Sequence, residues 1–226
     1  MANLIFDYDG TLHDSIHIYA PAFRLSYEHL VQRGLAVHRE WTNTQISYWL
    51  GYSAKDMWEN FMPELSQLEK DFCSRIIGKE MVRFIQEGKA RLYPNAGAVL
   101  QKLREEGHNL IFLSNCKRSY MQANREYFNL DQFFSAFYCT EDFEFAPKWQ
   151  IFNIIRAKCS GNFLVIGDRW QDIEVATRHH LLSIGCTYGY GSDEELRDAT
   201  IWVSSTVEIL DALATVLRDG KSEYSK

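Results

Sequence analysis

The chain lacks the cysteine pattern of a disulfide-stabilised or zinc-binding protein. It has 5 cysteines, an odd number, and no two of them stand in a Cys-x-x-Cys spacing. Disulfide frameworks pair their cysteines, and zinc ribbons use that close spacing. We therefore expect reduced thiols, most of them buried, in a protein of the cytoplasm.

Long hydrophobic runs and an excess of positive charge are also missing. No apolar run approaches the roughly 20 residues of a membrane-spanning helix, and no cationic segment followed by a long apolar stretch stands near residue 1. The formal net charge is -6, which disfavours a general nucleic-acid or anionic-membrane surface. We therefore expect a soluble, cytoplasmic protein that has neither a nucleic acid nor a membrane as partner.

Apolar runs that alternate with helical patterns fill most of the chain. Its 226 residues, 46% of them hydrophobic, suffice for one large domain or for one domain with an insert. Short apolar runs bounded by turn signals predict buried strands at 3–6, 110–113, 136–139, 163–167, 181–185 and 201–203. Helices between such strands predict an α/β fold with a parallel, doubly wound sheet and right-handed crossovers.

One interval, from about residue 15 to residue 87, shows helical patterns and no convincing strand. Ser53 can cap a helix over 54–61. A helix over 66–86 has apolar positions at Leu68, Phe72, Ile76, Met81 and Ile85. This interval predicts an inserted all-helical domain at 15–87, with residues 1–14 and 88–226 forming the α/β core.

Two carboxylates, Asp7 and Asp9, follow the first strand and precede a Gly-Thr turn. Parallel sheets bind their ligands beyond the carboxyl ends of the strands, which is where this pair is expected. Buried charge is costly unless a cation or hydrogen bonds compensate it. The pair therefore indicates a bound metal ion.

Other chemically active groups are expected at the same edge of the sheet. Ser114 and Asn115 follow one apolar strand, and Asp168 follows another. Lys148 begins a helix that can reach this edge, and Asp172 lies about one helical turn after Asp168. Together these groups predict one acidic pocket that contains a cation and a hydroxyl.

Such a pocket suits phosphoryl transfer. Clustered carboxylates select a hard divalent cation, and Mg²⁺ combines a few carboxylates with waters and phosphate oxygens. A lysine and a hydroxyl beside it suit the oxygens of a phosphoryl group. One aspartate can attack phosphorus to form an aspartyl phosphate, and a second can act as general acid and then as base.

The segments that carry these groups resemble the four motifs of the haloacid dehalogenase-like (HAD) hydrolase superfamily. Residues 7–12, Asp-Tyr-Asp-Gly-Thr-Leu, are similar to the first motif, and Leu113-Ser114-Asn115 resembles the second. Lys148 fits the third motif, and residues 167–172, Gly-Asp-Arg-Trp-Gln-Asp, fit the fourth. The four occur in the family's order and span the core, so the resemblance does not rest on a single short match.

For the metal and the chemical step, the resemblance implies three aspartates. Asp7 is the expected nucleophile and a ligand of Mg²⁺. Asp9 is the expected general acid and base, and it also binds Mg²⁺ through its backbone carbonyl. Asp168 is expected to be a direct Mg²⁺ ligand.

For the transferring phosphate, the resemblance implies Ser114 and Lys148 as binding groups, with Asn115 in support. Asp172 is expected to act through water or by orienting Lys148. The insert at 15–87 resembles the family's cap, placed after the first motif. Within the cap, the segment that contains Gly51 and Tyr52 resembles a loop that contacts substrate.

Segments 93–94 and 187–191 resemble phosphoglycolate phosphatase-like members of the superfamily. Two positions depart from the family pattern: Trp149 stands where proline is common, and His179-His180 where a small pair is common. Neither change removes a catalytic group. They leave the finer subfamily open.

Several side chains also have an ordinary structural interpretation. His13 could line the pocket or lie in a surface turn, and the pattern does not favour the pocket. His179 and His180 are expected at a helix end or on the surface, and Cys116 is expected to be a buried, inert thiol. The cap aromatics, Trp41, Tyr48, Trp49, Tyr52 and Trp58, are expected mainly to fill a core.

The sequence as a whole predicts a Mg²⁺-dependent phosphatase that hydrolyses a small phosphorylated metabolite, as a monomer or a homodimer. A phosphomutase of the β-phosphoglucomutase type is one alternative, although Tyr19 stands where such relatives have a histidine. A phosphonate hydrolase would need a cap lysine, for which Lys55 is the candidate. A dehalogenase is disfavoured by Asp9, and an idle binding module by the intact set of motifs. The sequence does not name the substrate.

Overall fold

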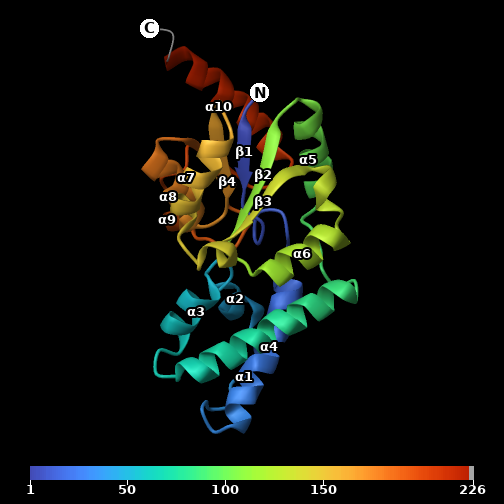
Figure 1. Cartoon of the computed structure of the whole chain (residues 1–226), viewed down its shortest axis with the longest axis vertical. Helices are drawn as coiled ribbons and strands as arrows, with labels where there is room; N and C mark the ends of the chain where they lie inside the picture. Colours follow the sequence, from blue (N-terminus) through green and yellow to red (C-terminus); the bar gives the residue numbers. More distant parts are fainter. Residues whose placement is uncertain (224–226) are drawn as a thin grey trace.

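A six-stranded, all-parallel sheet forms the centre of the computed structural model, which describes residues 1–223 and the side chains of residues 1–218. The strands are β1 (Asn3–Phe6), β2 (Asn109–Ser114), β3 (Phe134–Cys139), β4 (Phe163–Gly167), β5 (Leu182–Cys186) and β6 (Ile201–Val203). Their order across the sheet is β3-β2-β1-β4-β5-β6 (Figure 1). The predicted α/β fold with a doubly wound parallel sheet is therefore confirmed.

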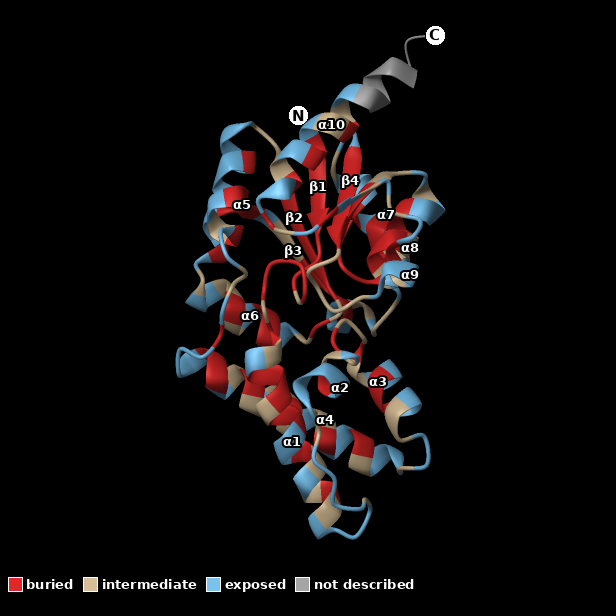
Figure 2. Ribbon diagram, turned by 180° about the vertical axis from the view of Figure 1, so that it is seen from behind, coloured by how far each residue is buried: buried red, intermediate tan, exposed pale blue. Residues whose placement is uncertain are grey.

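Helices cover both faces of this sheet. They are α5 (Ala96–Glu105), α6 (Arg118–Tyr127), α7 (Lys148–Lys158), α8 (Trp170–His179), α9 (Asp193–Leu196) and α10 (Glu208–Glu223), with short 3₁₀ helices at Leu130–Gln132 and Thr140–Phe143. Side chains alternate between the faces, so Leu4 and Phe6 pack with α5 and α10 while Ile5 packs with α7 and α8. Both faces are buried (Figure 2), which explains why the strands read as continuous apolar runs.

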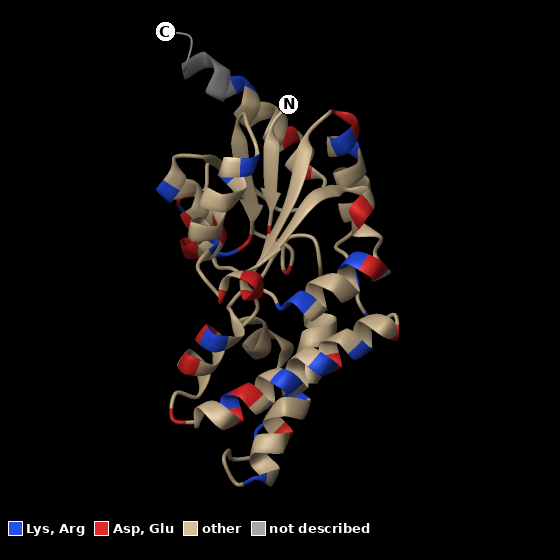
Figure 3. Ribbon diagram, viewed as in Figure 1, with Lys and Arg blue, Asp and Glu red and all other residues tan. Residues whose placement is uncertain are grey.

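The centre of the sheet determines where a site can form. β1 pairs with β2 on one side and with β4 on the other, and Phe6 is level with both Phe112 and Ile166. Further strands are therefore added on both sides of β1, and the carboxyl ends of β1, β2 and β4 lie next to one another. Ligands of open α/β sheets bind in the crevice at such a reversal of strand order. The strands contain no charged residue, and charge lies on the helices and connections (Figure 3).

The interval between β1 and α5 consists of helices, as predicted. These are α1 (Ile16–Gln32), α2 (Asn43–Ser47), α3 (Ala54–Phe61) and α4 (Gln67–Gln86). They lie beyond the carboxyl ends of the strands (Figure 1), with α4 packed along α1 and against α6. Ser53 caps α3 as expected, because its side chain accepts the backbone N–H of Asp56 at 3.1 Å. The division at residues 14/15 and 87/88 stays a prediction.

Helix α4 buries a different stripe from the one its first apolar residues suggested. Leu68 is 73% exposed and Phe72 is 40% exposed. The predicted Met81 and Ile85 are buried, and they are joined by Cys73, Ile77 and Phe84, which recur at helical spacing. The sequence offers two neighbouring apolar stripes, and packing against α1 selects the second. Among the described residues, no helix is both long and apolar enough to cross a membrane.

Candidate active site

Five predicted site residues meet at the carboxyl ends of the central strands. Asp7 follows β1, Ser114 ends β2, Asp168 follows β4, Lys148 opens α7 and Asp172 lies in the first turn of α8. All five are nearly inaccessible to solvent, with at most 4% of the residue exposed. Carboxylate oxygens of Asp7, Asp168 and Asp172 lie within 4.8 Å of one another. The structure therefore joins segments that are up to 165 positions apart, counting from Asp7 to Asp172.

Lys148 is shared between two of these carboxylates. Its Nζ donates to Oδ1 of Asp7 at 2.5 Å and to Oδ1 of Asp172 at 2.7 Å. Burial by itself lowers the pKa of Lys148, but the charges of Asp172 and Asp7 outweigh burial and raise the pKa above its ordinary value. Lys148 is therefore a fixed positive charge in the site.

One ammonium does not balance three buried carboxylates. Burial, followed by repulsion from Asp172, raises the pKa of Asp7 well above its ordinary value, although Lys148 opposes the shift. Oδ2 of Asp7 is buried and has no hydrogen-bond partner among the described residues. Such an atom is costly unless another group occupies its vicinity. The cluster therefore has the composition of a site for a hard cation.

Asp168 is held by the loops that surround it. Its Oδ1 accepts the hydroxyl of Thr11 at 3.1 Å, and its Oδ2 accepts the backbone N–H of Tyr190 at 2.7 Å. A Cβ at Gly10 or Gly189 would overlap this carboxylate, so close approach of the two loops requires glycine. Burial, followed by the charge of Asp172, raises the pKa of Asp168 to about 7.

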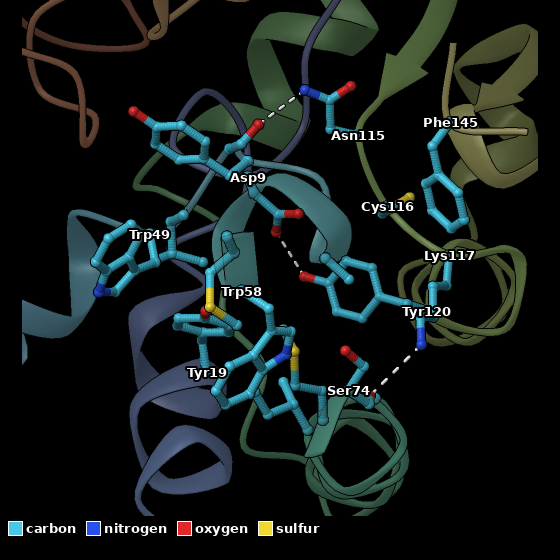
Figure 4. Close-up of a pocket in the computed structure, with 18 residues that line it drawn as sticks. Asp9, Tyr19, Trp49, Trp58, Ser74, Asn115, Cys116, Lys117, Tyr120 and Phe145 are labelled. Atoms are coloured by element: carbon cyan, nitrogen blue, oxygen red, sulfur yellow. Dashed lines mark hydrogen bonds between the residues drawn. The ribbon is translucent and has the colours of Figure 1, made fainter. Parts of the chain in front are cut away.

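Asp9 is positioned by two side chains that bind the same oxygen. Oη of Tyr120 lies 2.5 Å from Oδ1 of Asp9, and Nδ1 of His13 lies 3.1 Å from it (Figure 4 shows the Tyr120 contact). Tyr120 and His13 are themselves 2.8 Å apart. Both contacts are to Oδ1, and Asp9 also lines the cavity between the cap and the core.

His13 is not a surface-turn residue. It is fully buried, because the turn after Asp9 folds back and brings the ring onto Tyr8, with ring centroids 5.0 Å apart. For His13 the sequence leaves the pocket and a surface turn as alternatives, whereas nothing in the sequence indicates Tyr120 as a site residue. Tyr120 comes from α6, and no local pattern distinguishes it from an ordinary buried tyrosine on a helix.

The cap reaches the core through the segment 48–52. The amide of Asn115 donates to the carbonyl of Gly51 at 2.8 Å. The buried guanidinium of Arg169 binds the carbonyls of Tyr48 and Leu50 and pairs with Glu195 at 2.8 Å. Gly51 has a φ of +89°, and a Cβ there would lie 2.7 Å from Cγ of Arg169. Arg169 occupies a variable position of the fourth motif and was not predicted to contact the cap.

A cavity lies between the cap and the core beside Asp9 (Figure 4). Gly51 and Tyr52 line it from the cap, and Asn115 and the buried Cys116 line it from the core. That Gly51 and Tyr52 contact substrate stays a prediction. Tyr19 also lines it. Lys55 is exposed and lies outside this lining.

The remaining residues have ordinary structural roles. His179, the last residue of α8, contacts the carbonyl of Trp149 through Nε2 at 2.9 Å, and His180 is the exposed residue that ends the helix. Their predicted helix-end position is confirmed. Trp41 packs against Phe23 and Phe61 in the cap core. Among the five cap aromatics, Tyr48 departs from the core expectation, since it is 55% exposed.

The fold and the site together define an α/β enzyme whose acidic centre lies at the carboxyl ends of a parallel sheet. The family model for haloacid dehalogenase-like hydrolases matches residues 1–180. The chain therefore belongs to this family of hydrolases.

Known proteins of similar sequence include two hydrolases. The chain is 24% identical over 208 residues to a phosphoglycolate phosphatase of Aliivibrio fischeri, and the match covers 87% of this chain and 88% of that protein. It is 28% identical over 111 residues to a 5′-nucleotidase of Pseudomonas aeruginosa, and this match covers 47% of this chain and 50% of that protein.

Solved structures show the same fold. A predicted phosphatase from Clostridium acetobutylicum superposes with a TM-score of 0.81 at 22% identity, over 95% of this chain and 98% of that one. A predicted phosphoglycolate phosphatase from Haemophilus somnus gives a TM-score of 0.77 at 21% identity, over 94% and 98% of the two chains.

The buried charge of Asp168 predicts how stability depends on pH and metal. With its pKa raised to about 7 from an ordinary 3.8, the folded chain holds a proton that the unfolded chain has released. This stabilisation is present below about pH 4 and is lost as the pH rises through about 7. We expect metal-free protein to lose on the order of 2 kcal/mol relative to Asp168→Asn between about pH 5 and pH 8, measured by urea unfolding.

The same unfolding experiment is repeated for both proteins with added Mg²⁺. Added Mg²⁺ is expected to stabilise the original chain at high pH and to have little effect on Asp168→Asn, because the variant lacks one carboxylate of the cluster. An equal response of the two proteins to Mg²⁺ and to pH would rule out Asp168 as part of a cation site.

Proposed function

We propose that the chain is a phosphatase that hydrolyses phosphomonoesters of small metabolites, with Mg²⁺ as cofactor and an aspartyl phosphate at Asp7 as intermediate. The observation that carries the proposal is the buried cluster of Asp7, Asp168 and Asp172 around Lys148, next to a cavity lined by Asp9. The family membership and the similarity to a phosphoglycolate phosphatase support the same chemistry.

The residues present fit a magnesium ion. Asp7, Asp168 and Asp172 offer hard carboxylate oxygens, and Oδ2 of Asp7 has no other partner among the described residues. We assign Asp7, Asp168 and the backbone carbonyl of Asp9 as ligands, with Asp172 shared between this site and Lys148. The bound ion supplies positive charge that offsets the carboxylates and the phosphoryl oxygens.

Asp7 and Asp9 divide the chemistry between them. The carboxylate of Asp7 attacks phosphorus, the bond from phosphorus to the alcohol oxygen breaks, and Asp9 gives that oxygen its proton. Asp9, now ionised, takes a proton from a water whose oxygen attacks the phosphorus. The bond from phosphorus to Asp7 then breaks and releases inorganic phosphate.

The surrounding groups hold the reactants in place. Lys148 and the hydroxyl of Ser114 bind phosphoryl oxygens, and Lys148 also fixes the orientation of Asp7. Asn115 fixes the cap segment through Gly51, so its support of the phosphate is indirect in this arrangement. Tyr120 and His13 occupy Oδ1 of Asp9, which leaves Oδ2 as the oxygen that exchanges the proton.

The alternatives on the same fold receive less support. Lys55 is exposed and does not line the cavity, which disfavours a phosphonate hydrolase that uses this residue in a Schiff base. Tyr19 lines the cavity at the position expected for a mutase histidine, and a tyrosine does not replace imidazole as a proton shuttle near neutral pH.

Asp7→Asn tests the proposed nucleophile. An amide cannot attack phosphorus as a carboxylate does, so we expect turnover of p-nitrophenyl phosphate with Mg²⁺ to fall by about 10³-fold or more. Asp198→Asn, an exposed carboxylate on the core, is the control and should keep full activity. Near-normal turnover by Asp7→Asn, with the fold intact by circular dichroism, would refute the assignment.

Tyr120→Phe tests how Asp9 is positioned. Loss of the hydroxyl removes a hydrogen bond to Oδ1, and we expect kcat for an alkyl phosphate to fall about tenfold. Turnover of p-nitrophenyl phosphate should fall less, because its leaving group needs little protonation. Tyr127→Phe, on the same helix but 46% exposed, is the control. An equal loss for both substrates would mean that Tyr120 has only a structural role.

A further inference from the structure

The cavity beside Asp9 has a mostly aromatic and apolar wall. It is formed largely by side chains of the cap, among them Tyr19, Trp49, Tyr52, Met57, Trp58 and Met81 (Figure 4). The leaving group of a phosphomonoester bound at Asp7 must lie on the side of Asp9, because Asp9 gives it a proton. The chemistry of this wall therefore bears directly on the alcohol part of the substrate.

The cavity offers little to a negatively charged leaving group. Among the described residues, Lys117 is the single cationic side chain in the lining, and its ammonium is directed at the carbonyl of Ser74 at 3.5 Å. Arg169 lies over the ring of Tyr52, but its guanidinium is already bound to Glu195 and to cap carbonyls. A carboxylate taken out of water needs closely placed donors and positive charge.

Trp58 presents a polar atom without a partner. This residue is only 2% exposed, and its Nε1 is buried with no hydrogen-bond partner among the described residues. Indole nitrogen can act only as a donor. Because Nε1 has almost no accessible surface, an acceptor of a ligand, such as a carbonyl oxygen, reaches it only when a neighbouring side chain of the wall moves aside. In the close-up, Trp58 lies in the lining beside Tyr19 (Figure 4).

Gly78 enlarges the cavity on the α4 side. Glycine inside a helix is unfavourable relative to alanine, so its presence here needs a reason. A Cβ at Gly78 would meet only Cδ of Lys117, at 3.9 Å, so no packing constraint requires glycine. The missing side chain instead leaves room in the cavity that Gly78 lines.

We propose that the substrate is a phosphomonoester whose alcohol carries an uncharged heteroaromatic ring, as a nucleoside monophosphate does. The ring packs among Trp49, Tyr52 and Trp58, and an acceptor atom on it takes the N–H of Trp58. This inference rests on the proposed phosphatase activity and names the substrate class for it. It predicts that a small hydroxy acid is not the preferred leaving group.

Four phosphorylated compounds separate these possibilities. Phosphate release with Mg²⁺ is measured for uridine 5′-monophosphate, ribose 5-phosphate, phosphoglycolate and acetyl phosphate. Uridine 5′-monophosphate and ribose 5-phosphate both contain a phosphorylated ribose, but only uridine 5′-monophosphate also carries a heteroaromatic base. We expect kcat/KM for uridine 5′-monophosphate to exceed that for ribose 5-phosphate and for phosphoglycolate by about tenfold or more.

Three variants show whether the cavity causes this preference. Gly78→Leu fills the cavity with a helix-forming residue and is expected to remove the advantage of uridine 5′-monophosphate over ribose 5-phosphate. Trp58→Phe keeps an aromatic ring without the N–H and should lower that advantage about tenfold. Trp41→Phe is the matched control, because Trp41 is another cap tryptophan with an unpartnered Nε1 but lies outside this lining.

Acetyl phosphate separates failure of the inference from failure of the proposed function. Its acetate leaves without help from the cavity, so Asp7-dependent hydrolysis of acetyl phosphate tests the phosphatase activity alone. If that activity is present but phosphoglycolate or ribose 5-phosphate is preferred, the inference is overturned. It is also overturned if the preference for uridine 5′-monophosphate survives in Gly78→Leu. A preference for phosphoglycolate that disappears in Lys117→Met would assign Lys117 as a carboxylate-binding residue instead.

Discussion

The ion pairs of Lys148 with Asp7 and Asp172 are the interaction on which the rest of the site depends. Three carboxylates are buried within 4.8 Å of one another, and this ammonium contacts two of them directly. Without it, the like charges would disfavour folding or force the carboxyls to take up protons. With it, an excess of negative charge still remains. This excess is the reason for which we propose a divalent cation at the site.

The topology of the sheet explains why these groups meet. In the proposed function, the cap is the part that would select the substrate. β1 lies between β2 and β4, so polar residues that follow the three strands share one edge. Asp9 joins this edge to the cavity, and Arg169 and Asn115 hold the cap segment 48–52 against the core. In the proposed reaction, the core therefore contains the groups that act on phosphorus, while the cap contributes most of the wall that meets the leaving group.

The sequence predicts the parts of this arrangement that follow from local rules. Asp7, Ser114 and Asp168 follow buried apolar strands, and strand ends of a parallel sheet converge, so their meeting could be foreseen. Tyr120 could not, because only tertiary packing brings one residue of α6 to Asp9. The stripe that α4 buries was also ambiguous, since two neighbouring stripes were apolar and contact with α1 decided between them.

Mass spectrometry of the enzyme quenched with acid during turnover can identify the residue that carries the phosphoryl group. Acid preserves an acyl phosphate long enough for peptide mapping, so the phosphorylated residue can be identified. We expect a phosphoryl group on the peptide that contains Asp7, at the carboxylate of that residue. Phosphorylation at Asp168 or another side chain, or steady turnover without any phosphorylated residue, would contradict it.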